Sequence, residues 1–156
     1  MSFSPCRVAR RSLPFVLLAA GSLALAAWIP VRAQEPAASE LLEHSMEQMN
    51  GALKALLKGI DASNRDKSLA NLAKLQAGVV AAKAETPPMA ATLEESKRPE
   101  FVAGFRRKLV EVLATSCRIE TAILDGNYDD ANKLVKDELT RLKKEGHDTY
   151  QEEQEE

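Results

Sequence analysis

The chain has 156 residues, of which 45% are hydrophobic and 28% charged, and its formal net charge is −2. This length suffices for one domain with one hydrophobic core. The sequence contains no glycine-rich phosphate loop, no Ser-His-Asp set and no Cys/His zinc spacing, so nothing in it supports an enzyme.

The first 33 residues have the organisation of a secretory signal peptide. Three arginines precede the apolar run 13–29, and Val31-Arg32-Ala33 places small residues one and three positions before the expected cleavage point at Gln34. The alternative, a retained membrane anchor, is disfavoured because the apolar run is short for a membrane span and is followed by this cleavage site. We therefore expect a periplasmic protein that, once cleaved, has no attachment to the membrane.

Removal of residues 1–33 would take away four of the 21 basic residues and none of the 23 acidic ones. The mature chain would then carry 17 basic against 23 acidic residues, a formal charge of −6. Such a charge argues against nucleic acid as a partner. Cys117 would be the one cysteine left, so an internal disulfide is excluded. We expect Cys117 to be a small buried residue on a helix, with an intermolecular disulfide as the alternative.

The first predicted helix begins at Ser39, a suitable N-cap, carries Glu40 in its first turn, and ends near Asp61. Its apolar residues recur at steps of three and four and form one stripe, which consists of Leu42, Met46, Met49, Leu53, Leu56 and Ile60. His44 points to a different face, so we expect it on the surface.

A second helix is predicted from Arg65 to Lys83, with an inward stripe of Leu69, Leu72, Leu75, Val79 and Ala82. The segment Thr86-Pro87-Pro88 ends it, because proline lacks the amide hydrogen and disfavours helical backbone in the preceding residue. The stretch from Pro87 to about Arg98 is the one long connection of the chain.

The third predicted helix starts at Pro99 and runs to about Leu124, with Phe101, Phe105, Leu109, Val112, Ile119 and Ile123 along one face. A tight turn over residues 125–128 follows. The fourth helix begins at Asp129 or Asp130, and its stripe consists of Tyr128, Ala131, Val135, Leu139 and Leu142. Residues 151–156 form an acidic tail.

No strand pattern occurs in this sequence, and two short turns flank one long middle connection. The sequence therefore predicts an all-α fold, an up-down-up-down antiparallel four-helix bundle over residues 39–150. In such a bundle the start of the first helix and the end of the fourth helix meet at the same end.

Four local motifs, in this order, resemble the periplasmic cytochrome b562 family. They are Met-Glu-x-x-Asn-x-x-Leu-Lys from Met46, Thr-Pro-Pro from Thr86, Phe-x-x-Gly-Phe from Phe101, and a glycine turn followed by Leu-x7-His that ends at His147. Each motif is weak alone, but together they span nearly all of residues 39–150 and follow a signal peptide.

The resemblance implies a haem-binding bundle that transfers electrons, with one haem b held without covalent links. The sequence has no C-x-x-C-H motif, which agrees with the absence of thioether links. The family's axial methionine and histidine match Met46 and His147, and its two phenylalanines near the porphyrin match Phe101 and Phe105. Lys143, one turn before the histidine, is implied as a partner of a haem propionate. The redox partner protein is unknown, and the charge of −6 favours a basic one.

Helix geometry leaves the direction of His147 open. At 100° per residue, His147 lies about 100° around the fourth helix from the centre of its apolar stripe. A local change of helix winding near Gly146 would bring it inward. Two other interpretations therefore stay open. One is a haem-free periplasmic binding or stress protein, and the other is a small copper module that uses His44, Met46 and Met49.

Overall fold

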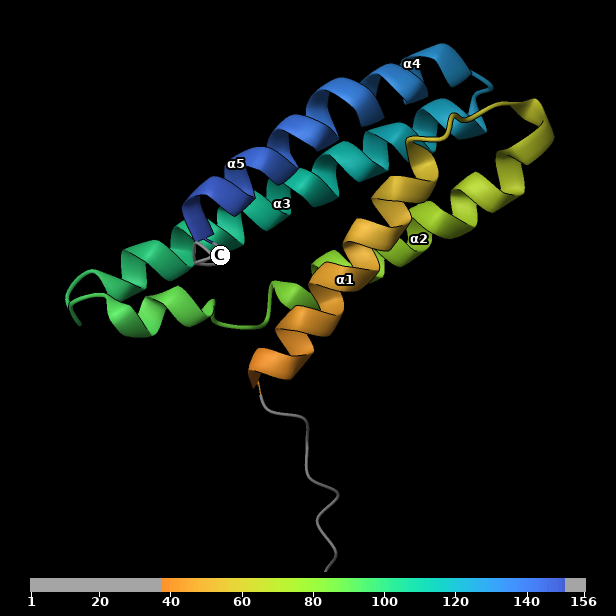
Figure 1. The fold of residues 1–156 in the computed structure, drawn as a ribbon. Coiled ribbons are helices and arrows are strands. Elements are labelled where there is room, and N and C mark those ends of the chain that lie inside the picture. Colours follow the sequence, from red (N-terminus) through yellow and green to blue (C-terminus); the bar gives the residue numbers. More distant parts are fainter. Residues whose placement is uncertain (1–37, 151–156) are drawn as a thin grey trace, which may run out of the picture. The chain divides into compact units, whose positions relative to one another are not determined.

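The computed structural model describes residues 38–150, and the predicted signal peptide and acidic tail lie outside this range. Within it the chain forms an antiparallel four-helix bundle without strands, which confirms the predicted fold (Figure 1). In chain order the elements are α1 (Ala38–Leu56), η1 (Ala62–Asn64), α2 (Arg65–Ala82), η2 (Pro88–Thr92), α3 (Arg98–Leu124), α4 (Tyr128–Lys133), η3 (Leu134–Leu139) and α5 (Thr140–Tyr150).

The first helix is shorter than predicted, because it ends at Leu56 and not near Asp61. Gly59 has a φ of 107°, a left-handed backbone that glycine adopts without steric cost and that no α-helix contains. Ile60 follows this break and is nevertheless buried. The apolar stripe therefore continues past the end of the helix, which is why the sequence pattern placed the boundary too late.

Asp61 is the N-cap of η1, the short helical segment that precedes α2. Its Oδ1 accepts hydrogen bonds from the backbone N–H groups of Ser63 at 2.7 Å and Asn64 at 3.1 Å, and Asn64 Oδ1 accepts in return from the Asp61 N–H at 3.1 Å. This reciprocal capping satisfies backbone donors that a helix start leaves without partners. The helix α2 then runs almost over its predicted range.

The fourth helix consists of three successive pieces, α4, η3 and α5. The segment η3 is a π-helix, a wider turn than the α-helix. Because a single π turn accommodates one additional residue, the residues after it are rotated by about 100° relative to an uninterrupted α-helix. The side-chain direction that we predicted for His147 from an uninterrupted α-helix therefore changes by this rotation.

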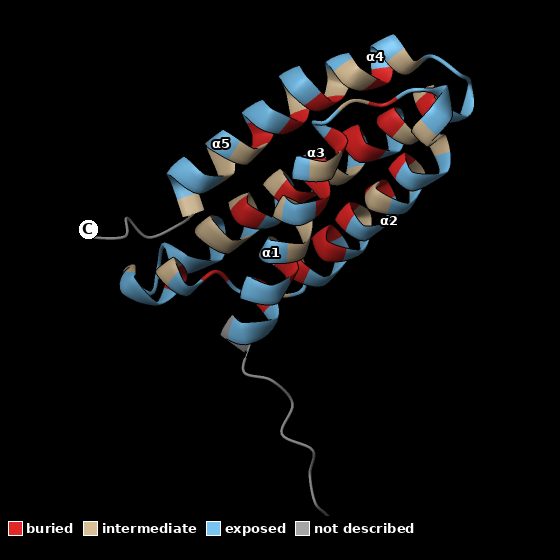
Figure 2. Ribbon diagram, turned by 45° about the vertical axis from the view of Figure 1, so that its right-hand side comes forward, coloured by how far each residue is buried: buried red, intermediate tan, exposed pale blue. Residues whose placement is uncertain are grey.

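The buried residues form one core between the helices, and Figure 2 shows them on the inward faces. Most of the predicted stripe residues belong to this core, including Leu56, Leu72, Ile119, Val135 and Leu142. Cys117 is exposed, so the prediction that it would be buried was wrong. It neighbours the buried Ser116 and lies on the outer side of α3.

A second polar contact closes the end of the bundle that holds the α1–α2 connection. Asn132 of α4 accepts a hydrogen bond from the Ile60 N–H at 2.9 Å, and its Nδ2 donates to the Ile60 carbonyl at 2.8 Å. The same Nδ2 donates to the Tyr128 carbonyl at 2.8 Å. One amide side chain thus joins two segments that are 72 residues apart.

Among the helices of residues 38–150, none is long and apolar enough to cross a membrane.

Candidate functional site

The predicted site residues lie at the end of the bundle where α1 begins and α5 ends. Phe105 is buried with 4% of its surface exposed, and Met46 is half-buried against the core. Phe101 and Lys143 are also half-buried, whereas His147 is exposed. The structure thus brings Phe105 into the core and Met46 against it, and leaves Phe101, Lys143 and His147 outside it.

One hydrogen bond fixes the register between the two helices that carry the predicted ligands. Lys143 Nζ of α5 donates to Asn50 Oδ1 of α1 at 2.8 Å. Met46 lies four residues before Asn50, and His147 lies four residues after Lys143. Because the helices are antiparallel, both steps run about 6 Å toward the same end, at a rise of 1.5 Å per residue. Met46 and His147 therefore each lie about one helical turn beyond this bond, toward the same end of the bundle.

The same spacing places each predicted ligand on the face that bears the cross-helix bond. Residues four apart share a helix face, so Met46 lies below Asn50 on α1 and His147 lies below Lys143 on α5. The inward positions of α5 are taken by Leu142, which is buried, and by Tyr150, which is half-buried. His147 accordingly occupies the α1 side of α5 and not its innermost face.

Tyr150 is the contact residue of this end that sequence reasoning missed. Its ring packs edge-on against Phe101, with ring centroids 5.1 Å apart, and against Phe105, with centroids 5.4 Å apart. A signal was present, because Leu142 and Tyr150 are eight residues apart and so lie on one helical face. Asn50 was also missed, although it belongs to the first family motif.

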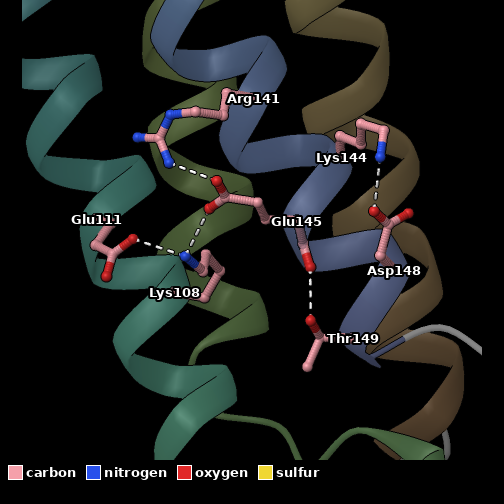
Figure 3. Close-up of polar contacts among 7 residues, drawn as sticks. All are labelled: Lys108, Glu111, Arg141, Lys144, Glu145, Asp148 and Thr149. Carbon is pink, nitrogen blue, oxygen red and sulfur yellow. Dashed lines mark hydrogen bonds and ion pairs between the residues drawn. The ribbon is translucent and has the colours of Figure 1, made fainter.

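An ion network holds the opposite side of α5 against α3 (Figure 3). Lys108 Nζ contacts Glu145 at 3.0 Å and Glu111 at 2.9 Å, and Arg141 contacts the second carboxylate oxygen of Glu145 at 2.6 Å. The hydrogen bonds that Lys108 donates to Glu111 and then to Glu145 raise the pKa of Lys108, and the hydrogen bonds that Glu145 accepts from Arg141 and then from Lys108 lower the pKa of Glu145. These contacts tie the turn before His147 to α3.

The residues of the copper interpretation do not converge. His44 is exposed, as predicted, whereas Met49 faces α2, where its Cγ would lie 2.7 Å from a Cβ built on Gly78. Within residues 38–150, no three His, Cys, Asp or Glu side chains are grouped so that they could hold a metal ion. Methionine is not among these four residue types, so this finding bears neither on the copper interpretation nor on a haem with a Met/His ligand pair.

The side chains at this end fit a non-covalently held haem in kind. Helix α1 carries a thioether and α5 an imidazole at the same end of the bundle, Phe101 and Phe105 provide aromatic surface there, and Lys143 provides a cation. Both ligand types are established axial ligands of haem iron.

The fold and this end of the molecule define a class, the four-helix bundles that build a cofactor site from facing helices. The model of the family described as Cytochrome b562 matches residues 41–151, and the chain belongs to this cytochrome b562 family. Its members are haem-binding electron carriers. No curated protein and no solved structure matches the chain.

Proposed function

We propose that this protein is a periplasmic b-type cytochrome that carries single electrons, with one haem b held non-covalently between Met46 and His147. The main support for the ligand pair is the hydrogen bond from Lys143 to Asn50, because Met46 and His147 each lie one turn beyond it on the helices that it joins. The family match, which includes both residues, supports haem as the ligand. The signal-peptide pattern of residues 1–33 supports the periplasm.

When bound, the haem supplies a one-electron iron couple whose reduction potential is higher with a Met/His ligand pair than with two histidines. The chain binds and orients it. Met46 and Phe105 provide apolar surface on one side of the proposed haem site, which would keep water away from the iron. Phe101 would add aromatic surface, and Lys143, which is half-buried and bonded to Asn50, would pair with a propionate. With Met46 and His147 both engaged, no open position is left for a substrate.

The test is a titration of the mature protein with haemin, followed by absorption spectra of the oxidised and reduced forms. We expect saturation at one equivalent with sharp low-spin bands. The bands should be lost in Met46→Ala and in His147→Ala, because each removes one axial donor.

Two matched controls separate ligation from general damage. Met49→Ala removes a methionine from the same helix, and His44→Ala removes the other histidine of the chain. Both controls should keep the low-spin bands. Bands that survive Met46→Ala and His147→Ala, or that disappear in His44→Ala, would contradict the ligand assignment.

The exposure of His147 favours one competitor, a haem-free bundle that binds something else or protects other proteins. That function requires the same apolar stripes but neither Met46 nor His147. It predicts no saturable spectral change with haemin, so the same titration decides between the two functions.

A further inference from the structure

We propose that Gly104 and Tyr150 form a positioning contact that holds the last turn of α5 on α3 and thereby orients His147. The proposal rests on the proposed function, since it concerns the histidine that we assign as a haem ligand. It adds two residues that act through another one and do not themselves bind iron.

The contact is defined by the space that Gly104 leaves open. A Cβ atom built on Gly104 would lie 2.7 Å from the hydroxyl oxygen of Tyr150 and 3.8 Å from the ring carbon that bears it. The first distance is a collision, whereas the second is an ordinary van der Waals contact. The phenol oxygen therefore lies against the bare backbone of α3, and any larger residue at position 104 would displace it.

Two aromatic contacts hold the ring on either side of this position. Phe101 and Phe105 lie three residues before and one residue after Gly104, and their rings meet that of Tyr150 at interplanar angles of 62° and 70°. Such edge-to-face contacts are favourable beyond the area they bury, because the positive ring edge meets the negative ring face. The end of α5 thus packs against Phe101, Gly104 and Phe105 of α3.

The packing of Tyr150 on α3 affects the position of His147, because Tyr150 lies three residues further along the same helix. Residues three apart are neighbours on a helix surface, so a rotation or lift of the Tyr150 turn moves the His147 turn with it. The Lys143–Asn50 bond holds α5 toward α1 one turn earlier. The His147 turn lies between these two contacts, which together limit how far its backbone can rotate. Holding a ligand in place before binding reduces the ordering that binding must impose.

The experiment compares Gly104→Ala, Tyr150→Phe and the double variant, all loaded with haem. The rate of haem transfer to an excess of a scavenging haem protein is measured, together with the oxidised and reduced spectra. Gly104→Ala should speed haem loss by roughly three- to tenfold, as expected for the loss of an aromatic contact that orients a ligand. Tyr150→Phe alone should be close to the unmodified protein, since it keeps the ring contacts.

The double variant is the decisive member. With the oxygen removed, the nearest ring atom is at van der Waals distance from the new methyl group, so haem loss should return close to the unmodified rate. A merely destabilising effect of Gly104→Ala would not be rescued in this way. As a control, Gly51→Ala, at a site where a Cβ meets nothing within 4 Å, should leave the rate unchanged.

Unchanged haem loss in Gly104→Ala would overturn the positioning role, and so would faster loss that Tyr150→Phe fails to rescue. The proposed function would survive either result, provided that Met46→Ala and His147→Ala still abolish the low-spin bands. Absence of saturable haem binding by the unmodified protein would overturn both.

Discussion

At the scale of single residues, the structure shows which side chains do more than their type suggests. Asn50 and Tyr150 look like an ordinary polar and an ordinary terminal residue, yet each joins α5 to another helix. His147, which ends the Leu-x7-His motif, is exposed. Contact partners thus add information that residue type does not hold.

Asp61 carries a prediction at this scale. Its pKa is lowered, chiefly by the hydrogen bond that the Ser63 hydroxyl donates to it at 2.6 Å, and also by the backbone N–H groups of Ser63 and Asn64. Because the folded-state pKa is below the unfolded one, the ionised carboxylate stabilises the fold above the unfolded pKa, and this contribution is lost as pH falls through the folded pKa.

We therefore expect Asp61→Ala to lower Tm at neutral pH and to have a smaller effect at a strongly acidic pH below the lowered folded-state pKa of Asp61, where the unmodified protein has lost the charge of this carboxylate. Thermal unfolding followed by circular dichroism at the two pH values measures this difference. An equal loss of Tm at both values would show that the charge of Asp61 contributes nothing.

At the scale of helices, the sequence was informative about extent and face and less so about ends and winding. The stripe of α2 and the proline pair after it predicted that helix nearly to the residue, because periodicity and backbone chemistry both act locally. The end of α1 was misplaced because Ile60 is buried from outside the helix. The π-helical segment η3 was not predicted from the apolar stripe of the fourth helix.

Close contact between α1 and α2 gives a prediction that uses two glycines as a matched pair. A Cβ on Gly78 would lie 2.7 Å from Met49 Cγ and 3.0 Å from the Ser45 carbonyl oxygen, whereas a Cβ on Gly51 meets nothing within 4 Å. We expect Gly78→Ala to reduce the free energy of unfolding by about 1–3 kcal/mol, as overpacking does.

Gly51→Ala should instead raise the free energy of unfolding by about 0.5–1 kcal/mol, because alanine is the better helix former. Urea denaturation of both haem-free variants gives the two values. Equal and small effects would mean that α1 and α2 do not approach each other as closely as described.

At the scale of the whole molecule, the two helical hairpins are joined by different chemistry at the two ends. At the candidate haem end the joint is the hydrogen bond from Lys143 of α5 to the side chain of Asn50 in α1. At the opposite end the joint is Asn132, which holds the backbone of Ile60. The predicted topology put the first turns of α1 and the last turns of α5 at the same end, but the Lys143–Asn50 contact itself was not predicted. Asn132 was not predicted, because its partner is backbone and leaves no trace in side-chain patterns.

Asn132→Asp tests the joint at the opposite end. A carboxylate still accepts from the Ile60 N–H but is unable to donate to the Ile60 and Tyr128 carbonyls, so two oxygens would face one another. We expect a loss of about 1–3 kcal/mol in the free energy of unfolding, the usual cost of an unsatisfied buried polar group. Asn127→Asp, at an exposed position without a side-chain cap bond, is the control and should change little. Equal effects of the two substitutions would rule out a specific joint.

We propose that the sulfur of Met46 and a ring nitrogen of His147 hold the haem. Methyl NMR of the reduced, haem-loaded protein tests the Met46 sulfur directly. Cleavage at Gln34 leaves three methionines, Met46, Met49 and Met89, so their labelled methyl groups give three signals. A methyl group bound through sulfur to haem iron lies over the porphyrin and is strongly shifted upfield by its ring current. If Met46 is the ligand, we expect one such signal, which is absent in Met46→Leu and retained in Met49→Leu. An upfield signal that persists in Met46→Leu, or none in the unmodified protein, would contradict it.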